Sequence, residues 1–269
     1  MKTKKIYNVL SIAGTDPTGG AGIQADLKTF SALGVYGTTV ITSLIAQNTC
    51  GVQSVYPVRS SFVEKQLESI FSDINIHSMK IGLLSKHSII KVVIEKINKY
   101  QIPLVVLDTV INSSDGKQLL DKNAIKILKN RLLPLVSIIT PNLPEAAVLL
   151  NSFEAKNEKQ IIEQGKQLLS MGCKAVIMKG GHLSGKLSTD WFITPKKSIK
   201  IDDIRINTKN THGTGCTLSA AIAAKIPNCK DWFQAVYEAK KWLQKAIIHG
   251  DSLLIGKGMG PVHHFHEWW

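Results

Sequence analysis

A polar turn with two glycines runs directly into a helix of small residues between Asn210 and Ala224. Gly213 and Gly215 can adopt backbone angles that are closed to other residues, and they let a ligand approach the main chain. The free amides and the positive dipole end of the following helix would face that ligand. The segment therefore predicts an anion site with phosphate as its expected guest, although a loop that only caps a buried helix gives the same pattern.

Cys216 falls in the first turn of this helix, where the pKa of a thiol tends to fall. A thiol of lowered pKa would place a proton acceptor or a nucleophile beside the bound anion. One hypothesis is that Cys216 accepts a proton beside the bound anion. The other is that Cys216 is the nucleophile of a hydrolase, which would need a histidine paired with it.

Short apolar runs rich in β-branched residues alternate with amphipathic stretches through most of the chain. This alternation predicts a three-layer α/β/α fold with a mainly parallel central sheet. No internal repeat or long linker interrupts it, so residues 1–269 are expected to form a single domain. The expected strands are residues 7–12, 39–46, 78–83, 104–107, 136–140 and 175–178, followed by a more antiparallel pair at 191–194 and 198–201.

Three of the helices between these strands carry recognisable signals. Apolar residues spaced three and four apart from Ile23 to Leu33 form one stripe that would face the sheet, and the glycine after Leu33 would end that helix. Ser61 and Glu64 match a capping box, and Pro144 is typical of the first position of a later helix.

Ligands bind at the carboxyl ends of the strands in open parallel sheets, so the residues that follow each strand are candidates for a site. Polar or glycine-rich segments follow most of the predicted strands. In chain order they are residues 13–22, residues 47–49, Asp108, residues 141–145 and residues 179–182. One rim of the sheet is therefore expected to collect them.

The first of these segments is a glycine-rich loop that would let a small flat ligand rest against the backbone. Asp26, about one turn into the following helix, could accept hydrogen bonds from an amine or a hydroxyl of that ligand. Gln47 offers both a donor and an acceptor, which suits a heteroaromatic ring. The alternatives are plain turn chemistry for the loop and a polar strand end bonded to a loop for Gln47.

Two acids and a lysine at neighbouring strand ends suit bound phosphates. Asp108 and Glu145 are hard oxygen ligands of the kind that Mg²⁺ uses together with waters and phosphate oxygens, although isolated acids are also often helix caps or solvated. Lys179 follows an apolar strand and precedes two glycines, so it could reach a phosphate as a point charge, although a lone lysine is also a common surface residue. The histidines at 263, 264 and 266 lack the helical spacing of a zinc site and are expected to pack or fray.

Composition excludes several classes of protein. The formal net charge is +13, but the lysines are spread along helix faces without an aromatic-interleaved block, so no nucleic-acid partner is expected. No window of about 18 uncharged apolar residues appears, which argues against a membrane partner, and the absence of a signal-peptide pattern predicts a cytoplasmic protein. The four cysteines are far apart, so neither a zinc site nor a disulfide framework is indicated.

Motifs along nearly the whole chain carry a family likeness: SIAGTDP at residues 11–17, GAGIQADLK at 20–28, AQNT at 46–49, TPNLPE at 140–145, MKGGH at 178–182, THGTGCT at 211–217 and GMGPVHH at 258–264. In these motifs the sequence resembles the hydroxymethylpyrimidine and phosphomethylpyrimidine kinases of thiamine biosynthesis, in the ribokinase-like superfamily. The resemblance implies a ribokinase-like fold, a homodimer, and transfer of the γ-phosphoryl group of ATP, with Mg²⁺, to the hydroxymethyl group of 4-amino-5-hydroxymethyl-2-methylpyrimidine. A second transfer would convert the monophosphate to the diphosphate.

The resemblance also implies roles at matching positions. The pyrimidine would be surrounded by Gly14, Asp26 and Gln47, the ATP phosphates would be bound by Lys179 and its neighbours, among them Thr214, and Glu145 would lie in the Mg²⁺ region, beside the Asp108 that its strand-end position already suggests. Cys216 occupies the place where many ribokinase-like sugar kinases have an aspartate base, and Gly213 and Gly215 would supply amides to the group in transfer.

One segment departs from the family's pattern, which is roughly Asp-x-Val-Met-x-Ala-Lys-Ser-Gly after the fourth strand. This chain reads DTVINSSDG at residues 108–116, with Ser114 in place of the usual lysine. The departure implies altered closure of a flap or weaker handling of the second phosphate. Two rival functions stay open: a pyridoxine-type vitamin kinase on the same fold, and a phosphate- or RNA-binding module suggested by the positive charge.

Overall fold

An eight-stranded sheet forms the centre of the computed structural model, which describes residues 5–111, 119–181 and 183–269. The strands are β1 (Asn8–Ala13), β2 (Tyr36–Ile41), β3 (Ser43–Asn48), β4 (Gly51–Pro57), β5 (Ser78–Ile81), β6 (Val105–Leu107), β7 (Ile138–Ile139), β8 (Ala175–Lys179), β9 (Leu187–Ile193) and β10 (Ser198–Ile204). The large sheet has the order β10-β9-β8-β7-β6-β5-β1-β2, and β3 pairs with β4 in a separate sheet. In the large sheet, the neighbouring strands along the order β8-β7-β6-β5-β1-β2 are all parallel. β9 and β10 add an antiparallel edge, as predicted for residues 191–194 and 198–201.

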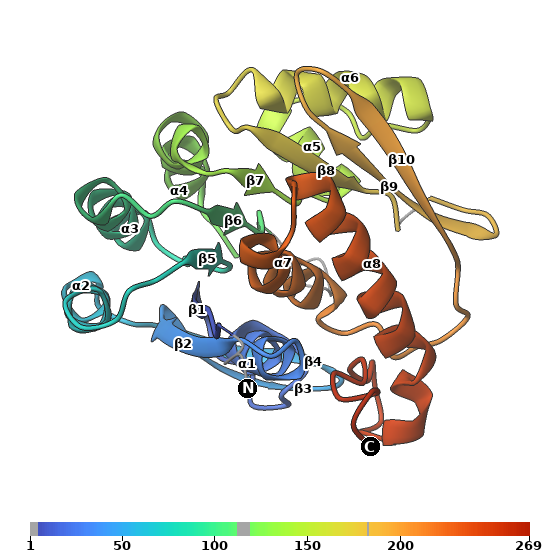
Figure 1. The fold of residues 1–269 in the computed structure, drawn as a ribbon, viewed down its shortest axis with the longest axis horizontal. Helices are drawn as coiled ribbons and strands as arrows, with labels where there is room; N and C mark the ends of the chain where they lie inside the picture. The colour runs from blue at the N-terminus through green and yellow to red at the C-terminus, as the bar shows by residue number, and fades with distance from the viewer. Residues whose placement is uncertain (1–4, 112–118, 182) are drawn as a thin grey trace.

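Helices cover both faces of the large sheet (Figure 1). They are α1 (Gly22–Ala32), α2 (Ser60–Phe71), α3 (His87–Tyr100), α4 (Lys122–Ile127), α5 (Leu143–Leu150), α6 (Glu158–Leu169), α7 (Thr214–Lys225) and α8 (Trp232–Ile248), with short helical turns at η1 (Leu128–Leu132), η2 (Leu133–Leu135), η3 (Ile226–Asn228) and η4 (Gly250–Leu253). α1, α7 and α8 share a core with Val9 of β1, whereas α2 to α6 share the opposite core with Leu10, the next residue. The predicted α/β/α layers are therefore confirmed. None of the described helices is long and apolar enough to cross a membrane.

α7 is built largely of small residues and is buried along most of its length. The residues from Leu218 to Ala224 are each at most 3% exposed. Small side chains let the helix lie close to the sheet and to its neighbours α1 and α8. Ser78 of β5 donates its hydroxyl to the carbonyl of Ala223 at 2.6 Å. These contacts hold the N-terminus of α7 at the carboxyl edge of the sheet.

One predicted strand forms two. Residues 39–46 were expected to be continuous, but the chain passes from β2 into the separate sheet at Thr42. Thr42 is fully buried, its amide donates to the Ala13 carbonyl at 2.9 Å, and its hydroxyl donates to the Leu83 carbonyl at 2.5 Å. No glycine or proline marks this break, so the local pattern could not show it. β4 was not predicted, since its side chains do not alternate cleanly between buried and exposed.

The capping box occurs at a different helix from the one predicted. α2 begins before Ser61 and makes no capping hydrogen bond, so the box predicted at Ser61 and Glu64 is wrong. At α5, Asn142 Oδ1 accepts from the Glu145 amide at 2.8 Å, and the Glu145 carboxylate accepts from the Asn142 amide at 2.9 Å. Pro144 is the second residue of this helix rather than the first, because Asn142 caps it.

Gly165 of α6 packs closely against Ile193 of β9, and it allows a test of this packing. A Cβ at Gly165 would lie 2.2 Å from Cδ1 of Ile193. Alanine is the better helix former by about 1 kcal/mol, but overpacking a core contact costs about 1–3 kcal/mol. We therefore expect Gly165→Ala to lower the free energy of unfolding, measured by urea denaturation.

The matched control removes the clashing atom. Ile193→Val deletes Cδ1, so adding Gly165→Ala to Ile193→Val should cost less than adding it to the wild type. Equal costs in both backgrounds would contradict the packing account.

Candidate active site

A cavity of about 1080 Å³ opens at the carboxyl ends of the parallel strands. Its walls include the loop after β1, the start of α5, the end of β8 and the N-terminus of α7. Nine predicted site residues line it: Gly14, Gln47, Asp108, Glu145, Lys179, Gly213, Thr214, Gly215 and Cys216. Residues from distant parts of the chain are thus brought around one space, and only Asp26 of the predicted set lies outside its lining.

The turn before α7 presents open backbone amides to this cavity. Gly213 is the N-cap in the left-handed region, with φ of 75°, and no side chain caps the helix. The amides of Gly215 and Cys216 have no hydrogen-bond acceptor among the described residues. Two convergent amides at a helix N-terminus can bind an anion. We name residues 211–216 the anion turn.

The thiol of Cys216 does not have the lowered pKa that its place in the helix predicted. Burial raises the pKa of Cys216 to about 11; Lys80 opposes this shift, and the carboxylates of Asp108 and Asp26 add to it. Desolvation therefore outweighs the attraction of the Lys80 ammonium for a thiolate. At neutral pH Cys216 is a thiol. None of the described histidines is hydrogen-bonded to it, so the pairing that a hydrolase needs is not present there.

Lys179 provides a fixed positive charge beside the anion turn. Its Nζ lies 3.1 Å from Asp108 Oδ1, which also accepts from Thr140 Oγ1 at 3.1 Å. A Cβ on Gly215 would come 3.2 Å from the same Nζ, which shows how close the ammonium is to α7. Burial opposes the charge, but Asp108 and Glu145 outweigh burial and hold the pKa of Lys179 above its usual range. Lys179 is therefore charged where an anion would bind.

Asp108 and Glu145 can together serve a magnesium ion that arrives with phosphate. Glu145 Oε2 accepts from the Asn142 amide at 2.9 Å and from Thr109 Oγ1 at 3.1 Å, and burial raises the pKa of Glu145. Glu145 Oε1 and Asp108 Oδ2 have no hydrogen-bond partner within the described ranges. Among all the residues that the structure describes, no group of three or more His, Cys, Asp or Glu side chains could hold a metal ion. Mg²⁺ needs only one or two carboxylates with waters and phosphate oxygens, so this pair fits it.

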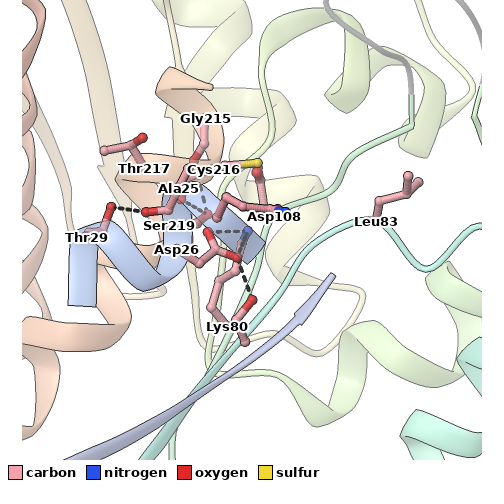
Figure 2. A network of polar contacts seen from close by, with 12 residues as sticks. Ala25, Asp26, Thr29, Lys80, Leu83, Asp108, Gly215, Cys216, Thr217 and Ser219 are labelled. Carbon is pink, nitrogen blue, oxygen red and sulfur yellow. Dashed lines mark hydrogen bonds and ion pairs between the residues drawn. The ribbon is translucent and has the colours of Figure 1, made fainter. Parts of the chain in front are cut away.

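Asp26 lies beneath the cavity rather than in its wall. Both carboxylate oxygens are 2.8 Å from Lys80 Nζ of β5, and Ser11 donates its hydroxyl to Asp26 at 2.5 Å. Figure 2 shows Asp26 and Lys80 joined below Cys216 and Asp108. Burial opposes the charge on Lys80, but Asp26 holds the pKa of Lys80 above its usual range. Asp26 is therefore not placed to make the substrate contact that was predicted for it. Its side chain is fully buried, and both carboxylate oxygens are paired with Lys80.

The small sheet and the loop after β1 pack together in the wall of the cavity, because the Thr15 amide donates to the Ser43 carbonyl at 2.9 Å and Thr15 Oγ1 accepts from the Ile45 amide at 3.0 Å. Ile45 and Gln47 of β3 face the cavity, and the register of the β3–β4 pair shifts just before Gln47. Such a bulge turns a side chain away from the regular alternation. A Cβ at Gly14 would lie 2.6 Å from Ser43 Oγ. The missing side chain at position 14 therefore lets the loop after β1 pack against β3, which also carries Gln47 in the cavity wall.

Two residues of the site, Asp16 and Lys80, were not predicted. Asp16 and His212 are hydrogen-bonded to each other at the cavity edge, and Lys80 lies beneath it. One feature of the sequence could have revealed Lys80, because a charged residue within an apolar strand needs a buried partner. No such feature marks Asp16, since the chemistry of turns is enough to explain an aspartate at that position. The predicted changes at residues 112–118 and the motif residue His182 lie outside the described residues.

The histidines near the C-terminus pack into the structure. His263 and His264 are 5% and 4% exposed, and His264 Nε2 lies 3.0 Å from Thr217 Oγ1 of α7. Burial lowers the pKa of His264 to about 3, so it is neutral. These residues support α7 rather than line the cavity.

One protein family matches the chain along most of its length. The sequence pattern of phosphomethylpyrimidine kinases matches residues 16–263. The chain belongs to this family. The hydroxymethylpyrimidine/phosphomethylpyrimidine kinase of Escherichia coli is 57% identical over 98% of this chain and 100% of that protein. Its counterpart from Salmonella typhimurium is 56% identical over 97% of this chain and 98% of that protein.

Solved structures of two kinds of kinase share the fold. The phosphomethylpyrimidine kinase of Clostridium difficile is 39% identical, with a TM-score of 0.80 over 90% of this chain and 100% of that chain. A pyridoxal kinase from Staphylococcus aureus in complex with ADP is 30% identical, with a TM-score of 0.91 over 98% of this chain and 96% of that chain. The predicted ribokinase-like fold is therefore confirmed.

The buried Asp26–Lys80 pair yields a stability prediction. Removing one partner leaves an uncompensated buried charge, which costs about 3–5 kcal/mol. We expect Asp26→Asn to lower the free energy of unfolding by this order, measured by urea denaturation. Asp26→Asn combined with Lys80→Met removes both charges and should be more stable than Asp26→Asn alone. A loss below about 1 kcal/mol in the single variant would show that the pair is not needed for the fold.

Proposed function

We propose that this chain transfers the γ-phosphoryl group of ATP to 4-amino-5-hydroxymethyl-2-methylpyrimidine, and then phosphorylates the monophosphate to the diphosphate, in thiamine diphosphate biosynthesis. The observation that carries the proposal is the family match over residues 16–263 on a chain whose anion turn, Lys179 and Gln47 line one cavity. Relatives named as this kinase extend over nearly the whole chain.

Positioning and charge neutralisation are the main demands of phosphoryl transfer. The amides of Gly215 and Cys216 and the ammonium of Lys179 face the same part of the cavity. In the proposed reaction they bind the transferred group and the charge on its oxygens, with Thr214 beside them at the start of α7. They are in place before substrate arrives, so little reorganisation is needed during transfer.

The pyrimidine ring lies against the wall that the loop after β1 and the small sheet form together in this proposal. Gln47 can donate to a ring nitrogen and accept from the exocyclic amine. Gly14 lets this loop pack against Ser43 of β3, so the loop and Gln47 stay in the same wall. The hydroxymethyl group then points toward Cys216 and the anion turn.

Asp108 and Glu145 are the residues that would hold Mg²⁺, each through the carboxylate oxygen that has no partner among the described residues. When bound, Mg²⁺ supplies charge neutralisation for the ATP phosphates. Asp108 has a further task, because it holds Lys179 in position through its other oxygen.

Cys216 orients the accepting hydroxyl in this proposal. Its pKa of about 11 keeps the thiol protonated at neutral pH, so it is poorly suited to act as a base. Alignment of the hydroxyl is the more important requirement in a loose transition state.

We extend the proposal to the whole protein by family likeness. Residues 1–269 act as one kinase domain and form a homodimer in the cytoplasm. The +13 charge is spread along the chain and favours anionic substrates such as ATP, with no nucleic-acid or membrane partner.

Product analysis tests the activity directly. Incubation of the purified protein with hydroxymethylpyrimidine, ATP and Mg²⁺ should give the monophosphate first and the diphosphate later, separated by ion-exchange chromatography. Chelation of Mg²⁺ should stop both steps. Release of inorganic phosphate with no phosphorylated pyrimidine would contradict the proposal.

A second candidate is phosphorylation of pyridoxal, favoured by the high structural similarity to pyridoxal kinases. The same assay separates the two when both acceptors compete for limiting ATP. A kcat/KM for pyridoxal far above that for hydroxymethylpyrimidine would make the second candidate the main function.

The orienting role of Cys216 predicts a mild effect of Cys216→Ser. The hydroxyl of serine can also orient the acceptor, so we expect kcat to stay within about tenfold of wild type, whereas loss of a general base costs about 10²–10⁴-fold. Because the raised pKa leaves Cys216 protonated at every pH below about 11, the profile of kcat from pH 6 to 9 should have the same shape in both proteins. A step present in the wild type and absent from the variant would contradict this role.

A further inference from the structure

Asp16 collects hydrogen bonds from two separate loops and from Gln47 of β3 at the edge of the cavity, where it is 1% exposed. Within its own loop, the amide and hydroxyl of Thr18 donate to Oδ1 at 2.8 and 2.7 Å, and the amides of Gly20 and Ala21 donate to Oδ2 at 3.1 and 2.7 Å. His212 Nε2, from the anion turn, lies 2.8 Å from the same Oδ2. An ionised carboxylate has no hydrogen to give, so His212 is the donor.

The donors around Asp16 keep its carboxylate ionised. Burial would raise the pKa of Asp16, but hydrogen bonds from His212, Gln47 and Thr18 outweigh burial and hold the pKa well below its usual range. Hydrogen bonds to a charged acceptor are roughly twice as strong as those between neutral groups. Asp16 is therefore a strong link between its loop and the elements around it.

The two loops also touch through their glycines. A Cβ on Gly213 would lie 1.8 Å from the Gly20 carbonyl oxygen, and a Cβ on Gly20 would lie 2.6 Å from Cδ2 of His212. His212 is held from its other side, because its amide donates to the Gly260 carbonyl at 3.0 Å. Backbone contact and the Asp16–His212 hydrogen bond together fix how the loops lie against each other.

Each loop carries one side of the proposed reaction. The loop at residues 14–22, here named the acceptor loop, lines the cavity through Gly14 and Ala21, as Gln47 of the neighbouring β3 also does. The anion turn lines it through the amides of Gly215 and Cys216. The relative placement of the two loops therefore sets the distance between the accepting hydroxyl and the transferred group. A misplacement of about 1 Å can cost a reaction about a hundredfold.

We propose that Asp16 and His212 are positioning residues for phosphoryl transfer, whose hydrogen bond locks the acceptor loop to the anion turn so that the accepting hydroxyl, and not water, is aligned with the γ-phosphoryl group. This inference rests on the proposed function. Without the lock, Lys179 and the amides of α7 still bind ATP. Water then attacks the γ-phosphorus, the bond to the bridging oxygen breaks, and the products are ADP, inorganic phosphate and a proton.

The test compares transfer with hydrolysis in the same reaction. Asp16→Asn keeps the shape of the side chain, but one carboxylate oxygen becomes an NH₂ group that faces the N–H and O–H donors now bonded to Asp16. His212→Leu fills a similar space and removes the donor from the anion turn to Asp16. With ATP, Mg²⁺ and hydroxymethylpyrimidine, we expect both variants to lower kcat for transfer about tenfold or more and to raise the ratio of inorganic phosphate to phosphorylated pyrimidine about fivefold, with KM for ATP within about threefold of wild type.

Two controls separate positioning from general damage. His212→Gln restores a donor toward Asp16 and should return the ratio close to the wild-type value. Leu67→Ala removes a fully buried side chain of α2 that does not line the cavity, so it should lower the melting temperature while leaving the ratio unchanged. If Asp16→Asn does not fold, the two His212 variants decide the question.

Several outcomes would overturn the inference. Transfer and hydrolysis could fall together at a constant ratio, His212→Gln could be as impaired as His212→Leu, or Leu67→Ala could raise the ratio as well. An active wild type with any of these results would overturn the inference alone. A wild type that does not phosphorylate hydroxymethylpyrimidine would overturn the proposed function together with it.

Discussion

The close packing of α7 is the constraint on which the site depends. Its small side chains let this helix lie against the sheet, α1 and α8, and a hydroxyl from β5 is bonded to its backbone. Because the helix is held along its length, its N-terminus and the open amides of Gly215 and Cys216 have a fixed place at the carboxyl edge of the sheet. Gly213 has no side chain, so the acceptor loop can touch the helix start. The anion site is therefore set by packing away from the cavity as much as by the turn itself.

Charges beneath and beside the cavity determine the chemical state of its groups. Lys80 pairs with Asp26 in the interior, and Lys179 pairs with Asp108 at the wall. Asp26, which was predicted to contact a ligand, is instead paired with Lys80, as Figure 2 shows. The carboxylates and the burial around Cys216 keep its thiol protonated, although helix position alone favours the thiolate. The site thus holds the positive charge of Lys179 for phosphates and the neutral thiol of Cys216 near the proposed acceptor hydroxyl.

Kinases with two different acceptors share this fold. Phosphomethylpyrimidine and pyridoxal kinases share this architecture at 30–39% identity. An anion turn with a nearby lysine has the same task for any ATP-dependent transfer, so fold similarity alone does not identify the acceptor. In the proposed binding mode, discrimination between two small aromatic alcohols comes from the wall that faces the ring, made by the acceptor loop and Gln47 of β3. On this proposal, substitutions in that wall would change the preferred substrate while the anion turn and Lys179 keep their role.

Alternating apolar runs, glycine pairs and polar strand ends are local signals, so the layers, the rim and the anion turn could be predicted from the sequence. Family motifs added the activity. Four features could be seen only in the folded chain: the break at Thr42, the pairing of Asp26 with Lys80, the neutral state of Cys216 and the bond between Asp16 and His212, which are 196 residues apart. Hydrogen-bond partners and pKa values depend on groups within a few ångströms in space. Local sequence patterns do not record which distant residues those groups are.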